Sequence, residues 1–172
     1  ANTKIHLLKI HDFKIFSEKI QTQSKLQIKF EVDVDPSTQF EYETKYLLDP
    51  TSFPVISLKL PDLFAGKIHA LLFRQWKNRI KGRDFYDYVW YLKKGTPVRL
   101  KYLKEKSIQS GHIGQDDFQT VDELKSALLK RFDTVDFERA KKDILPFIRD
   151  TKEVEIWNPD FFKQITEKIQ VL

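Results

Sequence analysis

The spacing of apolar residues changes at residue 61, and this change limits the folds that are available to the chain. Before it, apolar and polar residues alternate as in β-strands over four segments, 4–10, 25–35, 41–48 and 53–60. After it, apolar residues recur every three to four positions, as in helices that pack by one face. The sequence therefore predicts an α+β fold, with a small, mostly antiparallel or mixed sheet in residues 1–60 and a helical domain in residues 61–172.

Local signals place several helix ends. Pro61 occupies a first helical position, and Pro146 is expected to kink or end a helix that begins near residue 135. Thr120 followed by Glu123 is typical of a capping box. In this motif the side chain of the first residue accepts a hydrogen bond from the backbone N–H of the second, and the side chain of the second accepts one from the backbone N–H of the first. The predicted helices span residues 61–76, 83–94, 99–109, 121–132, 135–150 and 160–170.

The composition indicates a folded protein of ordinary type. Of the 172 residues, 41% are hydrophobic and 13% aromatic, which favours a packed core over disorder. The absence of cysteine excludes disulfides and thiolate metal sites. Because no apolar run approaches about 18 residues and the start ANTKIHLLKI lacks the features of a secretory signal, we expect a soluble cytoplasmic domain with no membrane contact.

Positive charge is concentrated in the middle of the chain. The net charge is +5, but residues 59–106 hold 13 Lys and Arg against four Asp and Glu, while the remaining residues hold 17 against 21. Such clustering favours a polyanionic partner, such as RNA, DNA or a nucleotide. A basic face that only contacts water would give the same pattern.

Five charged residues on the first two predicted helices are candidates for a site. Lys67 and Arg74 lie on the same largely apolar helix stripe, so Lys67 either pairs with an anion or extends to the surface. Asp84 and Asp87 share one face of the next helix, and Arg83 precedes them. Ordinary roles compete here, because Asp84 suits a helix N-terminus and Asp87 can pair with Arg83. All five side chains can meet in one cleft.

Two further carboxylates, Glu31 and Asp33, share the polar face of the predicted strand 25–35. Leu26, Ile28 and Phe30 lie on its other, apolar face. A strand with one dry face and one acidic face can hold a metal ion. It is also what a solvent-facing antiparallel strand looks like.

The segments PDLFAGKIHALLFRQW and KGRDFYDYVWYL resemble the third and fourth motifs of the nucleotidyltransferase AbiEii/AbiGii toxin family. Those motifs are a helix with a central lysine and a downstream arginine, followed by Arg-Asp-aromatic-x-Asp. KLQIKFEVDVDP resembles the second motif, an acidic strand beside the metal site. The tail, from QSGHI through WNPDFF, also follows a branch of the family, so the resemblance covers nearly the whole chain.

This resemblance implies a transferase with a DNA-polymerase-β-like core. Mg²⁺ would bridge the phosphates of a nucleoside triphosphate, and a nucleotide would pass to an RNA acceptor, tRNA in relatives, within a toxin–antitoxin or phage-defence system. Glu31 or Asp33 would bind the metal, and Lys67 would hold a phosphate. Asp84 or Asp87 would be the acid of the fourth motif. Arg74 and Arg83 would add charge for the triphosphate or for RNA.

One motif of the family is missing from the chain. The first motif, a Gly-Ser or Gly-Gly turn followed by Asp-x-Asp on a strand, has no counterpart, because no such turn precedes Asp33-Val34-Asp35. We therefore expect the C-terminal portion of a longer protein, inactive by itself. Two alternatives stay open: a non-catalytic basic module that binds nucleic acid, and a metal-dependent nuclease that uses Glu31, Asp33 and Lys67.

Overall fold

The computed structural model describes residues 40–76 and 79–172. The chain divides into two units, residues 1–35 and 36–172, and the described residues belong to the second. The predicted strands 4–10 and 25–35, with Glu31 and Asp33, lie outside the described residues.

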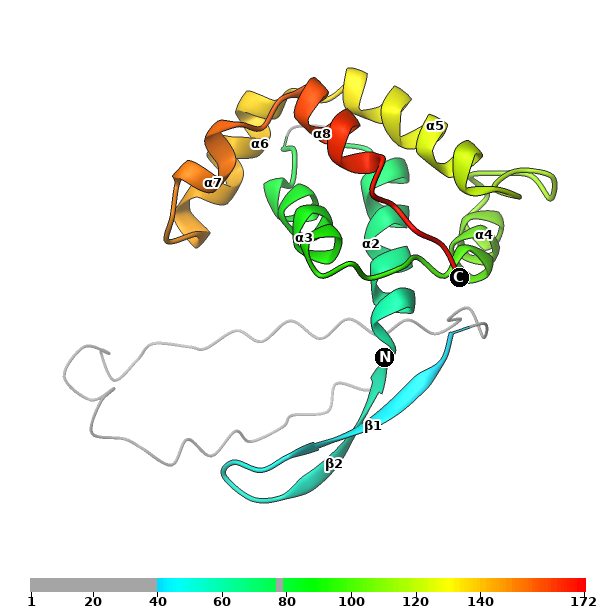
Figure 1. Cartoon of the computed structure of the whole chain (residues 1–172), viewed down its shortest axis with the longest axis vertical. Coiled ribbons are helices and arrows are strands. Elements are labelled where there is room, and N and C mark those ends of the chain that lie inside the picture. The colour runs from blue at the N-terminus through cyan, green and yellow to red at the C-terminus, as the bar shows by residue number, and fades with distance from the viewer. Residues whose placement is uncertain (1–39, 77–78) are drawn as a thin grey trace, which may run out of the picture. The chain divides into compact units, whose positions relative to one another are not determined.

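The described part begins with an antiparallel hairpin of β1 (Tyr42–Leu47) and β2 (Phe53–Leu58) (Figure 1). Its register pairs Tyr42 with Leu58 and Leu47 with Phe53. The alternating segments 41–48 and 53–60 predicted both strands. Most of the hairpin's large apolar side chains are exposed, among them Tyr42, Tyr46, Leu48 and Ile56.

Helices follow β2, and the change from strand to helix falls between Leu58 and Leu60. They are α2 (Leu60–Phe73), α3 (Gly82–Lys93), α4 (Leu100–Gln109), α5 (Val121–Asp133), α6 (Phe137–Ile144), α7 (Lys152–Glu155) and α8 (Pro159–Thr166). The predicted α+β class is confirmed. As Pro146 predicts, α6 ends at Ile144 and gives way to a short 3-10 turn, η1 (Leu145–Phe147).

The N-terminus of α5 shows how local chemistry fixes a helix end. The Thr120 side chain accepts a hydrogen bond from the Glu123 backbone N–H at 3.3 Å, as the capping-box pattern predicts. The Glu123 carboxylate accepts from the backbone N–H of Gln119 at 2.7 Å, one residue before the expected donor. Two backbone N–H groups at the start of α5 therefore have side-chain acceptors, which stabilises its first turn.

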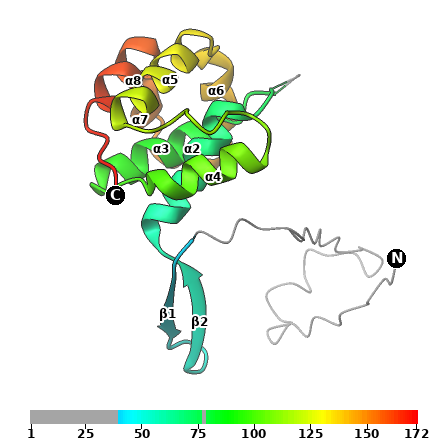
Figure 2. The same cartoon turned by 90° about the vertical axis from the view of Figure 1, so that its right-hand side faces the viewer.

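The helices form two layers. α2, α3 and α4 lie on the side of the hairpin, and α5, α6 and α8 lie beyond them in both views (Figures 1 and 2). α2 packs on α3, α4 and α5, α3 packs on α6, and α5 packs on α8. In the part of the chain that the structure describes, no helix is long and apolar enough to span a bilayer.

Aromatic side chains fill the space between the layers. Phe85 of α3 contacts Phe137 and Phe162 edge to face, with ring centroids 5.4 and 5.5 Å apart. Tyr88 is buried beside them, and its hydroxyl forms a 2.7 Å hydrogen bond with Thr166. Burial raises the pKa of Tyr88, so this phenol stays protonated. Asp84 and Asp87 thus extend from a helix whose other face is anchored in the core.

Candidate active site

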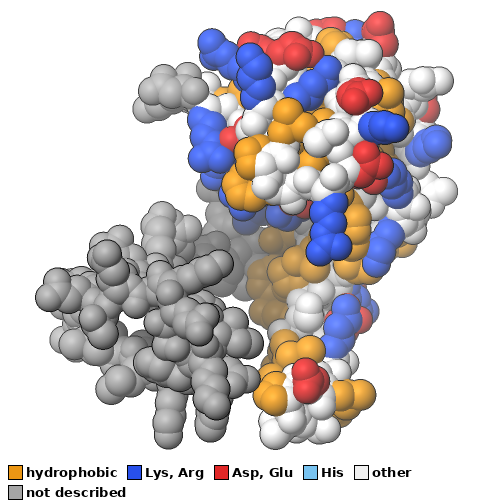
Figure 3. Space-filling view, turned by 90° about the vertical axis from the view of Figure 1, so that its left-hand side faces the viewer, with side chains coloured by type: hydrophobic (Ala, Val, Ile, Leu, Met, Phe, Trp, Pro, Cys, Tyr) orange, Lys and Arg blue, Asp and Glu red, His pale blue; other side chains and the backbone are white. Residues whose placement is uncertain are grey.

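The five residues predicted on α2 and α3 line one cavity of about 790 Å³. They are Lys67, Arg74, Arg83, Asp84 and Asp87. The opposite wall comes from η1, α7 and the segment between them, and includes Phe147, Arg149, Asp150 and Glu153. On the face of the helices that Figure 3 shows, Lys and Arg side chains stand out on the surface, with Asp and Glu side chains between them.

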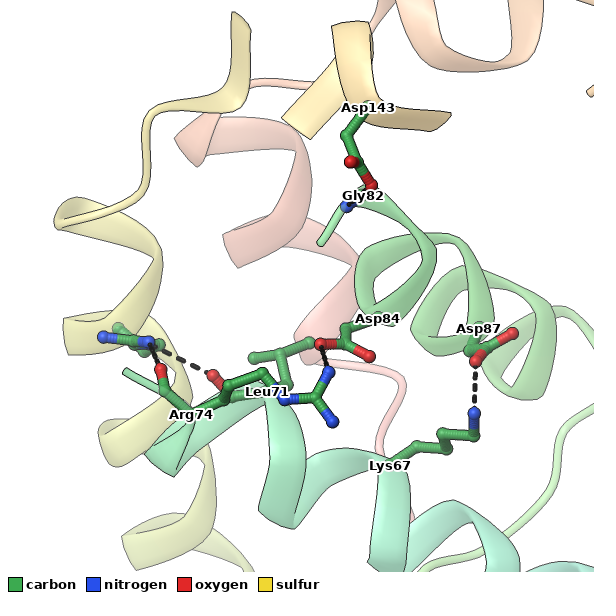
Figure 4. Close-up of polar contacts among 8 residues, drawn as sticks. Lys67, Leu71, Arg74, Gly82, Asp84, Asp87 and Asp143 are labelled. Atoms are coloured by element: carbon green, nitrogen blue, oxygen red, sulfur yellow. Dashed lines mark hydrogen bonds and ion pairs between the residues drawn. The ribbon is translucent and has the colours of Figure 1, made fainter. Parts of the chain in front are cut away.

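Lys67 of α2 faces Asp87 of α3 (Figure 4). The distance from Lys67 Nζ to Asp87 Oδ2 is 2.6 Å, and the side chains are 44% and 34% exposed. The anion that Lys67 contacts is therefore a carboxylate of this chain. Because both side chains are partly exposed, the pair contributes little to stability, and a ligand anion can reach the Lys67 ammonium.

Arg74 and Asp84 form a second, less accessible pair. Arg74 Nη1 lies 2.5 Å from Asp84 Oδ2, and only 8% of the Asp84 side chain is exposed. Asp84 also lies in the first turn of α3, where the helix dipole favours negative charge. Asp84 thus keeps the Arg74 guanidinium at the cavity wall.

Arg131 of α5 fixes the end of α2 that carries Arg74. Its guanidinium donates hydrogen bonds to the carbonyl oxygens of Leu71 at 3.1 Å and Arg74 at 2.7 Å, and it lies 4.1 Å from the centre of the Trp76 ring. Burial lowers the pKa of Arg131. No sequence signal predicted this contact, because the partners are 57 to 60 residues apart.

Asp143 of α6 fixes the start of α3 in a similar way. Its carboxylate accepts a 3.0 Å hydrogen bond from the Gly82 backbone N–H and pairs with Arg79. Gly82 is required there, because a Cβ atom would lie 2.1 Å from the Ala140 carbonyl oxygen. The close contact of α3 and α6 thereby sets where Asp84 and Asp87 point (Figure 4).

The far wall adds an aromatic and further charges. The Arg83 guanidinium lies 5.8 Å from the centre of the exposed Phe147 ring. Partial burial and the Glu153 carboxylate raise the pKa of Tyr86, which also lines the cavity. The sequence analysis missed this wall, because the residues of η1 and α7 follow no periodic pattern that ties them to α3.

Residues 40–76 and 79–172 contain no group of three His, Asp or Glu side chains that could hold a metal ion. The two carboxylates predicted as metal ligands, Glu31 and Asp33, lie outside the described residues. Two of the cavity's carboxylates, Asp84 and Asp87, are each paired with a cation of the same cavity.

Lysine and arginine side chains that converge in one cavity, as here, are the groups with which proteins contact phosphate oxygens. The sequence model of the family described as "Nucleotidyl transferase AbiEii toxin, Type IV TA system" matches residues 5–166. The chain belongs to this family, which confirms the resemblance found in its motifs. No curated protein and no solved structure is significantly similar to it.

Proposed function

We propose that the cavity between α2 and α3 binds the triphosphate of a nucleoside triphosphate and supports transfer of a nucleotide to RNA. The observation that carries the proposal is the convergence of Lys67, Arg74 and Arg83 in one cavity. Membership of a family of toxin nucleotidyl transferases supports a nucleotide substrate. We further infer, from the same family and from the basic segment 59–106, a tRNA acceptor, an antitoxin protein as partner, a cytoplasmic location and a role in phage defence.

In this proposal the carboxylates hold the cations ready before the substrate arrives. Asp87 keeps the Lys67 ammonium at the cavity, and a phosphate can bind the same ammonium from its exposed side. Asp84 does the same for Arg74, whose remaining N–H groups can donate to phosphate oxygens. Charges that are already in place need no rearrangement when negative charge develops on a transferring phosphoryl group.

The two aspartates then have different roles. Asp84 is almost fully covered and acts through Arg74, so we assign it as a positioning residue. Asp87 is more exposed, and it is the acid that can touch the substrate. Mg²⁺ would neutralise phosphate charge, but the described residues contain no group of three His, Asp or Glu side chains that could hold it. Its binding by Glu31 or Asp33 stays a prediction, and no step here depends on it.

The test is nucleotide transfer by the natural full-length protein, measured as incorporation of labelled nucleoside triphosphate into RNA. We expect Lys67→Ala to lower the rate about 10²–10³-fold, as when a single group that stabilises transition-state charge is removed. Asp87→Asn should also lower the rate, because the Lys67 ammonium is then no longer held at the cavity by a carboxylate. Lys45→Ala is the matched control, because Lys45 forms an exposed pair with Glu43 on the hairpin, away from the cavity. Unchanged transfer by both cavity variants would contradict the assignment.

The same variants address the non-catalytic alternative. A basic module that only binds nucleic acid would lose affinity steeply with added salt, and nucleoside triphosphate would not compete with RNA for it. Under the proposal, a nucleoside triphosphate binds the chain with an affinity that Lys67→Ala lowers.

A further inference from the structure

A second cavity, of about 370 Å³, lies between α2, α4 and the turn that follows α4. We call it the histidine pocket, and its walls include Gly66, His69, Phe73, Arg74, Lys106 and His112. The residues that line it include no carboxylate, in contrast to the first cavity. Except for Arg74, none of the five residues assigned to the transferase motifs lines it. Arg74 is the residue that lines both cavities.

The pocket contains a preformed aromatic stack. The Phe73 and His112 rings lie 4.6 Å apart with an angle of 6° between their planes. His112 is exposed, and its backbone N–H is fixed by a 2.9 Å hydrogen bond to the Ser107 carbonyl oxygen. A flat, exposed ring that is held by a second ring is the kind of surface on which an unpaired nucleobase stacks.

Among the described residues, the walls of the pocket carry cations and no carboxylate. Lys106 supplies one cation and Arg74, whose guanidinium is paired with Asp84, a second, and the His69 and His112 rings are 5.6 Å apart. Burial, the Lys106 ammonium and the His112 ring together lower the pKa of His69 to about 4. The pocket therefore keeps His69 neutral, chiefly because the ring is partly buried and secondly because cationic groups surround it.

The pocket also has room for a ligand beside the α2 backbone. A Cβ atom at Gly66 would meet nothing within 4 Å, so the helix surface there is open. A volume of about 370 Å³ suits one nucleotide and not a duplex. An unpaired nucleotide offers the two features that the pocket can bind, a flat base and a phosphate.

We propose that the histidine pocket binds an unpaired nucleotide of the acceptor RNA, with the base on the Phe73–His112 stack and the phosphate near Lys106 and Arg74. The proposal deepens the proposed function, and it rests on that function only for the statement that the bound RNA is the acceptor. Because Arg74 reaches both cavities, an RNA strand in this pocket lies next to the proposed triphosphate site.

The test is the affinity of the 172-residue chain for a fluorescein-labelled, single-stranded RNA 12-mer, measured by anisotropy without nucleoside triphosphate. We expect His112→Ala to weaken binding about tenfold, in line with the loss of one stacked base. His112→Phe keeps the flat ring and should stay within about threefold of the unchanged chain. Lys106→Ala should weaken binding and reduce the dependence on salt by about one phosphate contact.

Lys104→Ala is the matched control, because Lys104 lies on the same helix but does not line the pocket. We expect it to bind as the unchanged chain does. His112 is exposed, so its variants should fold, and their thermal unfolding checks this. Equal binding by His112→Ala and the unchanged chain, or equal binding of a duplex of the same sequence, would overturn the proposal.

A second titration separates this proposal from the proposed function. With a fluorescent nucleoside triphosphate as the probe, His112→Ala should bind normally and Lys67→Ala should bind weakly. If Lys67→Ala binds the triphosphate normally while His112→Ala still loses RNA, the triphosphate site is wrong and the histidine pocket stands. The reverse pattern overturns the pocket alone.

Discussion

At the scale of single residues, two glycines on consecutive helices differ in the space available for a side chain. Gly66 lies inside α2 with open space where a Cβ would be, so Gly66→Ala should stabilise the protein by up to about 1 kcal/mol through helix propensity. Gly82 begins α3 against the Ala140 carbonyl, so Gly82→Ala should destabilise it by about 1–3 kcal/mol. Urea unfolding measures both changes.

The two substitutions control each other, because each adds the same methyl group to a helix. If both moved the free energy of unfolding in the same direction, the contact of α3 with α6 at Gly82 would not be as close as the structure has it.

His69 gives a prediction for the effect of pH. Its pKa is about 4 in the folded chain, against an ordinary value of 6.5, so between these values the unfolded state binds the extra proton more readily. The free energy of unfolding should therefore fall as pH is lowered from about 6.5 toward 4. The groups that face His69 are Lys106, His112 and the Ser110 hydroxyl, which is 2.9 Å from Nε2.

The measurement is urea unfolding at several pH values, with His69→Gln for comparison. Glutamine can still bond to Ser110 but does not titrate, so its stability should change less over this range. Equal slopes for the two proteins would show that other groups cause the effect of acid.

At the scale of elements, a buried ion pair joins the start of the hairpin to α2 and α4. Arg99, at the N-cap of α4, lies 2.7 Å from Asp62 of α2 and 2.9 Å from Glu41. Asp62 is fully buried and also accepts a 3.2 Å hydrogen bond from the Glu41 backbone N–H. Arg99→Leu leaves this carboxylate without its counterion, so it should destabilise the protein by about 3–5 kcal/mol.

Arg139→Leu is the matched control for that prediction. Arg139 pairs with Asp136 on the surface, and its loss should change the free energy of unfolding by less than about 1 kcal/mol. Similar losses in the two variants would mean that the pair of Arg99 with Asp62 contributes no more than a surface ion pair.

The sequence predicted most elements because their signals are local. Apolar periodicity predicted β1, β2 and the longer helices. Thr120 correctly predicted the start of α5, and Pro146 correctly predicted the end of α6. The four-residue α7 carries no periodicity, so it was not predicted, and with it the far wall of the first cavity was missed. The Arg131 and Asp143 contacts were missed because their partners are about 60 residues away, where only tertiary structure brings them close.

At the scale of the whole described part, α2 separates two cavities of different charge. Lys67 lies on the side of the first cavity and His69, two residues later, on the side of the histidine pocket, because two residues turn an α-helix by about 200°. The positive charge of residues 59–106 is therefore not one uniform surface. Part of it is paired with Asp84 and Asp87, and part of it, at Lys106, faces a pocket without carboxylates.

Arg74 connects the two cavities, and its substitution tests whether they work together. Arg74→Lys keeps a positive charge for the buried Asp84 but loses the planar fork of N–H donors, so the chain should stay folded while both phosphate contacts weaken. We expect the affinities for nucleoside triphosphate and for single-stranded RNA to fall together, by about three- to tenfold each. Lys67→Ala should lower only the first affinity and Lys106→Ala only the second. A change in one affinity alone on Arg74→Lys would mean that Arg74 serves one cavity, and that the strand and the triphosphate do not meet at the end of α2.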